Sequence, residues 1–120
     1  METWQLDFHW LRVKHLVKDT MGLKQLPDLN GILFLIGMQE LGRWKEDFSK
    51  EEKQDLMHIA VCRLLSYDGY YEFVGRDGDG WPHYKLLKGV PEKGVKNQET
   101  LLKHKVIQYF DEWERENRNS

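Results

Sequence analysis

Aromatic and glycine residues are concentrated between residues 67 and 84 of this chain. Within that stretch, segments 70–76 and 81–88 are rich in aromatic and aliphatic side chains, and the residues DGDG between them have the composition of a tight turn. Pro82 lacks the N–H that a central strand needs, so the second segment belongs at a sheet edge. The stretch therefore predicts one β-hairpin.

The remaining sequence predicts helices, three before the hairpin and one after it. Gly22 and Gly42 are suited to end the first two helices, and SKEE at Ser49 has the pattern of a capping box. The predicted helices are residues 3–21, 29–41, 49 to about 66, and 97 to about 116. The fold class is thus mainly α with one β-hairpin, in the order α-α-α-ββ-α. In the apolar second helix, we expect Gly31 and Gly37 to permit close approach of a neighbouring element.

Length and composition predict a single folded domain over residues 1–120. The chain has 40% hydrophobic and 32% charged residues, which is enough apolar material for a packed core. The polar C-terminal tail, residues 115–120, is expected to fray.

The first helix has two apolar stripes on nearly opposite sides. A helix that rests on one core needs only one such stripe. Either this helix runs through the middle of the domain, or its second stripe meets another chain, for which a homodimer through the first and last helices is the simplest form. The stripe assigned to self-association consists of Trp4, Phe8, Leu11 and His15, and the opposite stripe of Leu6, Trp10, Val13 and Val17.

Charge and cysteine content narrow the function classes. The formal net charge is −2, whereas a nucleic-acid-binding module normally shows a basic excess, so nucleic acid is disfavoured as a partner. The single cysteine, Cys62, cannot form an intrachain disulfide, and the N-terminus lacks the organisation of a secretory signal. The longest apolar run, residues 32–38, is too short to cross a membrane. These features favour the cytoplasm.

The segment from Ser49 to Gly89 is predicted to be a helix followed by the hairpin. It resembles the passage from the third helix into the wing of a winged-helix domain. The resemblance implies a DNA-binding transcriptional regulator, whose basic residues would have to gather on one face. However, the expected wing tip, residues 76–80, is mostly acidic and glycine-rich, and acidic side chains are repelled by the DNA backbone. The basic candidates are Arg43, Lys45, Lys50, Lys53 and Arg63.

A second resemblance involves the segments LPDLNGILFLIGMQELG, FSKEEKQDLMHIAVCRLLS and DGDGWPHY. They are similar to those of a family of small uncharacterised proteins from Bacteroidetes, and they cover most of residues 26–84. The resemblance implies a bacterial cytoplasmic origin and carries no activity.

Catalytic and metal motifs are weak in this sequence, and we expect no cofactor and no catalytic residue. The DGDG turn lacks the later ligands of a calcium loop. The spacing of His58 and Cys62 could direct two donors at one ion, so a small metal-dependent enzyme that uses His58, Cys62, His15 or Asp19 is a further alternative.

The aromatic hairpin is the strongest candidate for a binding surface. Alternation along its strands would let one face cover the helices while the other presents rings to a protein partner. Aromatic and arginine side chains dominate the energetics of protein interfaces. We therefore predict a non-catalytic protein-interaction or accessory module, with partner contacts from Tyr71, Arg76, Asp79, Trp81, His83 and Tyr84.

Overall fold

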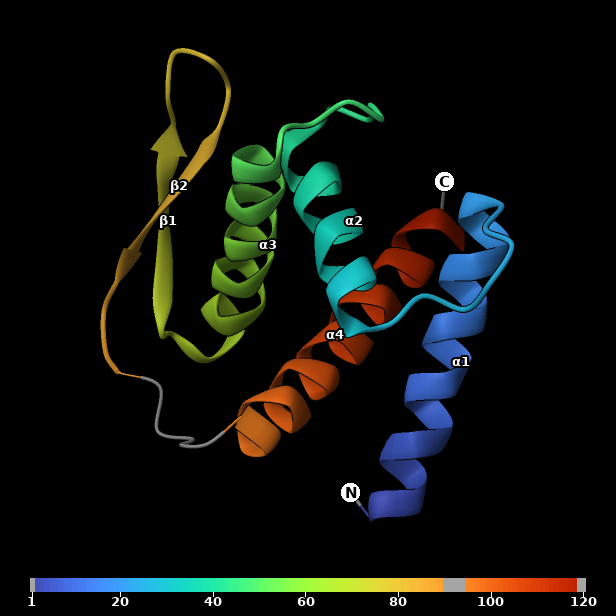
Figure 1. Cartoon of the computed structure of the whole chain (residues 1–120). Helices are drawn as coiled ribbons and strands as arrows, with labels where there is room; N and C mark the ends of the chain where they lie inside the picture. Colours follow the sequence, from blue (N-terminus) through green and yellow to red (C-terminus); the bar gives the residue numbers. More distant parts are fainter. Residues whose placement is uncertain (1, 90–94, 119–120) are drawn as a thin grey trace. The chain divides into compact units, whose positions relative to one another are not determined.

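The computed structural model describes residues 2–89 and 95–118, and within them it contains four α-helices and one antiparallel β-hairpin (Figure 1). This confirms the predicted fold class and element order. The first two helices have the predicted bounds, and the last begins two residues before the expected Asn97. The elements are α1 (Thr3–Met21), α2 (Leu29–Leu41), α3 (Lys50–Leu65), a 3-10 turn η1 (Ser66–Asp68), β1 (Tyr71–Arg76), β2 (Pro82–Leu86) and α4 (Val95–Arg118).

The chain divides into two compact units, Met1–Asp28 with Glu92–Ser120, and Leu29–Pro91. We call them the α1/α4 unit and the hairpin unit. The prediction of a single domain stays a prediction. In the predicted tail, α4 continues to Arg118, and the last two residues lie outside the described part of the chain.

In the α1/α4 unit, the two helices lie at an angle and come together toward their C-terminal ends, as Figure 1 shows. Arg12 joins them, because its guanidinium group donates to Asp111 at 2.7 Å and to Glu114 at 2.9 Å. As predicted, Gly22 ends α1 in the left-handed conformation, with a φ of 66°. The buried residues of α1 are those of a single stripe, namely Leu6, Trp10, Val13 and Val17.

In the hairpin unit, α2 and α3 run antiparallel and pack closely at Gly37. A Cβ atom added there would lie 2.2 Å from the main-chain oxygen of Leu56, so only glycine fits. This confirms the expectation for Gly37. The predicted capping box is also present, since Ser49 accepts from the N–H of Glu52 and Glu52 accepts from the N–H of Ser49.

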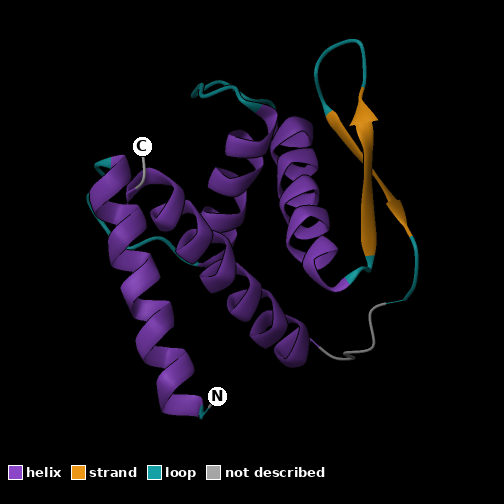
Figure 2. Ribbon diagram, turned by 180° about the vertical axis from the view of Figure 1, so that it is seen from behind, coloured by secondary structure: helices purple, strands orange, loops and turns teal. Residues whose placement is uncertain are grey.

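The hairpin lies against α3, which stands between it and α2 in both views (Figures 1 and 2). Its register pairs Tyr71 with Leu86 and Phe73 with Tyr84, and a β-bulge follows between Phe73 and Gly75. A core cluster lies beneath it, formed by Met38, Leu41, Phe48, Leu56 and Ile59.

Candidate functional site

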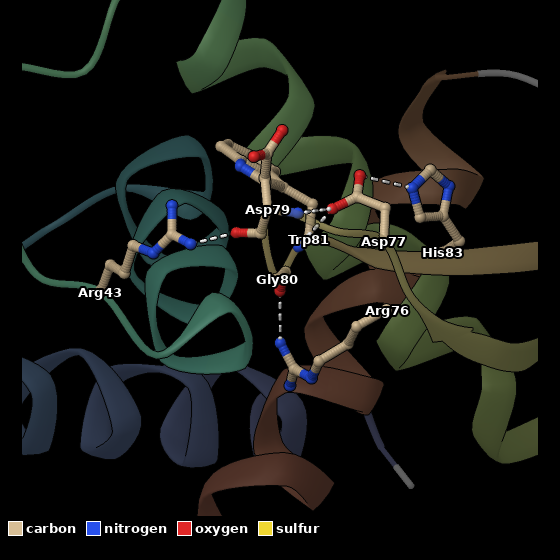
Figure 3. Close-up of polar contacts among 7 residues, drawn as sticks. All are labelled: Arg43, Arg76, Asp77, Asp79, Gly80, Trp81 and His83. Carbon is tan, nitrogen blue, oxygen red and sulfur yellow. Dashed lines mark hydrogen bonds and ion pairs between the residues drawn. The ribbon is translucent and has the colours of Figure 1, made fainter.

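The hairpin turn is organised by the carboxylate of Asp77 (Figure 3). One oxygen accepts from the main-chain N–H groups of Asp79 at 2.9 Å and Trp81 at 3.0 Å, and the other lies 2.9 Å from Nε2 of His83. The hydrogen bond to His83, followed by those to the main chain, lowers the pKa of Asp77. The turn is therefore a defined structure held by its own polar groups.

Two arginines tie this turn to the end of α2. Arg76 donates to the carbonyl oxygen of Gly80 at 2.9 Å and to that of Glu40 at 2.7 Å. Arg43 donates to the carbonyl oxygen of Asp79, as Figure 3 also shows. The Glu40 carbonyl belongs to the last turn of α2, where the helix dipole favours a positive charge. Among the predicted contact residues, Arg76 thus has a structural use for its guanidinium group, whereas the Asp79 side chain is exposed.

The three predicted aromatic contact residues are half-buried. Trp81 and Tyr84 pack against the core cluster, and Tyr71 meets the ring of His58 edge-on, with 6.4 Å between centroids. Burial, together with the charge of Glu40, raises the pKa of Tyr84 to about 12. Part of each ring remains open to solvent, and His83 is exposed beside them.

Three exposed apolar side chains of the two strands were not among the predicted contact residues. Phe73 is 50% exposed, Val74 57% and Leu86 56%, and the Phe73 ring contacts that of Tyr84 with centroids 5.6 Å apart. Strict alternation would have hidden one of the neighbours Phe73 and Val74, but the bulge breaks that alternation. Leu86 and Leu87 are neighbours in the sequence, so alternation cannot place both on one covered face. This pair was the sequence signal that could have predicted exposed apolar side chains here.

A cleft of about 320 Å³ lies between α3 and the hairpin, lined by His58, Cys62, Trp81 and His83 among others. Sγ of Cys62 is 3.5 Å from Nε2 of His58, which brings the predicted pair together. Burial raises the pKa of the Cys62 thiol to about 11, so the thiol is protonated at neutral pH. Within residues 2–89 and 95–118, no three His, Cys, Asp or Glu side chains are placed to hold one metal ion.

The stripe of α1 assigned to self-association lies on the surface. Trp4 is 68% exposed, Phe8 61% and Leu11 47%, and His15 is exposed as well. His15 and Asp19, the other candidate metal pair, are both exposed on α1.

Three of the five basic residues named for DNA contact have partners within the hairpin unit. Arg43 bonds the hairpin turn, Arg63 lies 3.3 Å from the Glu40 carboxylate, and Lys45 lies 4.7 Å above the Phe48 ring. Lys50 and Lys53 are exposed on the first turn of α3.

Comparisons with protein-family models, with curated proteins and with solved structures return no match to this chain. No helix in the described part of the chain has both the length and the apolar character that a membrane crossing requires.

Proposed function

We propose that this protein is a non-catalytic protein-interaction module of the bacterial cytoplasm, and that the β-hairpin is its contact surface. The observation that carries the proposal is the exposure of Phe73, Val74 and Leu86 beside the partly open ring of Tyr84. The Phe73 and Tyr84 rings are in contact, and contiguous exposed apolar surface is typical of sites that bind other proteins.

The rigidity of the hairpin supports the same function. Asp77 and Arg76 hold the turn, and Trp81 anchors it on the core cluster. A surface that is already ordered loses little conformational entropy when a partner binds. In this arrangement Arg76 and Trp81 position the surface. The partner is contacted by Phe73, Val74, Tyr84, Leu86 and His83.

The winged-helix alternative is less well supported. Arg43 and Arg63 are used inside the hairpin unit, and the turn carries Asp77 and Asp79 where phosphate contacts would be needed. The metal-dependent alternative is less well supported too, because no three His, Cys, Asp or Glu side chains in residues 2–89 and 95–118 are placed to hold one metal ion. A thiol with a pKa of about 11 is also a poor nucleophile at neutral pH.

The proposal is tested by affinity capture from a bacterial host, followed by calorimetry with the purified partner. The double variant Phe73→Ala and Leu86→Ala should weaken binding by at least about tenfold, because it removes central apolar contacts. Trp44→Ala is the matched control, since Trp44 is a similarly exposed aromatic residue of the same unit but lies off the hairpin. Equal binding by the double variant and the control would refute the hairpin as the contact surface.

A further inference from the structure

One side of α1 is apolar and exposed, and its residues have the spacing of a helix pairing seam. Trp4, Phe8, Leu11 and His15 are separated by four, three and four residues, the pattern of alternating core positions in paired helices. The buried stripe lies on the opposite side of the helix. The exposed stripe is therefore separate from the packing that α1 already makes.

We propose that this stripe binds the same stripe of a second copy, with the two α1 helices antiparallel. The spacing of four, three and four residues reads the same in both directions. A two-fold axis at its midpoint sets Phe8 against Leu11 of the second copy, and Trp4 against His15. Each large ring then meets a smaller side chain, which is the complementarity that close helix packing requires.

The charges beside the stripe allow ion pairs in this orientation. Asp7 and Lys14 lie on the same flank of the stripe but about 10 Å apart along the helix, too far to pair with each other. Neither makes an ion pair within the part of the chain that the structure describes. In an antiparallel pair the same flanks meet, so Asp7 of each copy faces Lys14 of the other. The two-fold symmetry therefore creates two equivalent ion pairs.

A parallel pair would bring different flanks together. The Asp7 and Lys14 flank would then face the flank that carries Arg12. In the usual parallel register Asp7 would face Arg12 of the second copy and Lys14 would face Asp19, both oppositely charged, although Arg12 is already bonded to Asp111 and Glu114. A parallel pair would, however, set Trp4 against Trp4 and Phe8 against Phe8, so side-chain size, and not charge, favours the antiparallel orientation.

The size of the stripe sets the strength of the dimer. From typical side-chain areas, two copies of the four side chains would bury roughly 900 Å² in total. Stable complexes usually bury about 1,200 Å² or more, so this dimer is a weak one, with a Kd of roughly tens to hundreds of micromolar. It should be visible only in concentrated solution.

Sedimentation velocity of the full chain from about 5 µM to about 1 mM tests the proposal. We expect a concentration-dependent monomer–dimer equilibrium, and Leu11→Asp should raise the Kd by at least about tenfold. Lys53→Asp is the control for added negative charge, since Lys53 is exposed on α3, and it should leave the Kd unchanged. A wild-type protein that stays monomeric up to about 1 mM would overturn the proposal.

A charge swap tests the orientation. Asp7→Lys and Lys14→Asp should each weaken the dimer several-fold at low salt, and the double variant should restore the wild-type Kd. Failure of the double variant to recover would exclude the antiparallel pairing. Thermal unfolding of the monomer provides a further check, because Leu11→Asp should leave its Tm within about 2 °C. A large drop in the monomer Tm would mean that the stripe is covered within the chain, which also contradicts the proposal.

Discussion

Arg76 donates a hydrogen bond of 2.7 Å to the main-chain oxygen of Glu40, and this bond ties the hairpin to the end of α2. Arg76→Ala should lower the free energy of unfolding by about 1 kcal/mol, since it removes this bond and the one to Gly80. Arg76→Lys should recover only part of the loss, because an ammonium group lacks the planar fork. Urea unfolding measures both effects. Lys85→Ala, a change at an exposed strand position, should be neutral, and equal effects of Arg76→Ala and Lys85→Ala would contradict the assignment.

Asp77 gives a pH-dependent contribution to stability. Its pKa is lowered in the folded protein, chiefly by the hydrogen bond to His83. The stabilisation is therefore present above the unfolded pKa near 4 and is lost as pH falls through the lower folded pKa. Asp77→Asn keeps an oxygen that can accept from the N–H groups of Asp79 and Trp81, but it removes the charge. Its stability difference from the wild type should be fully present above about pH 5 and should shrink by pH 2.5 in urea titrations. A difference independent of pH would show that the charge has no role.

Gly37 should tolerate no side chain. Gly37→Ala gains about 1 kcal/mol of helix propensity, but the new Cβ meets the main-chain oxygen of Leu56 at 2.2 Å, and backbone must move. We expect a net loss of at least about 2 kcal/mol in urea unfolding. Gly78→Ala is the matched control, since nothing lies within 4 Å of its added Cβ, and should change stability by less than about 0.5 kcal/mol. A stabilising Gly37→Ala variant would be inconsistent with the helix contact.

Truncation of Trp81 should destabilise the protein more than truncation of Phe73. Trp81 packs against the core cluster, so Trp81→Ala should cost about 2 kcal/mol of stability. Phe73 is half exposed, and Phe73→Ala should cost less than about 1 kcal/mol. Chemical unfolding of the two purified variants gives both values. If Phe73→Ala proved the more damaging, the division into anchoring and contacting rings would be wrong.

Cys62 should be almost inert in the folded protein. With a pKa of about 11, its thiolate fraction at pH 7.5 is about a hundredfold below that of an ordinary thiol, and the side chain is also buried. Labelling by an aromatic disulfide reagent should therefore be slow in buffer and fast in denaturant. Rapid native labelling would instead indicate an activated cysteine and would revive an enzymatic role.

Local chemistry in the sequence was sufficient to predict the order of the helices and strands and most of the residues at which they begin and end. Gly22 ends α1 through its left-handed backbone, and the Ser49 capping box begins α3 through bonds between residues three apart. The DGDG turn likewise depends on Asp77 and its close neighbours. These interactions involve residues near one another in the chain, so the pattern of residues alone determines them.

Which hairpin side chains are covered and which are exposed could be learned only from the tertiary structure. Which rings are covered depends on the packing of β1 and β2 on α3, and on a bulge that shifts the register after Phe73. Arg76 looked like a contact residue until its bond to Glu40, 36 residues earlier, gave it a structural role. For the first helix, the sequence determined that two apolar stripes exist, but it could not determine which one is buried. That choice depends on contacts between distant segments, such as Arg12 with Asp111, whose free energy is not encoded in any local pattern.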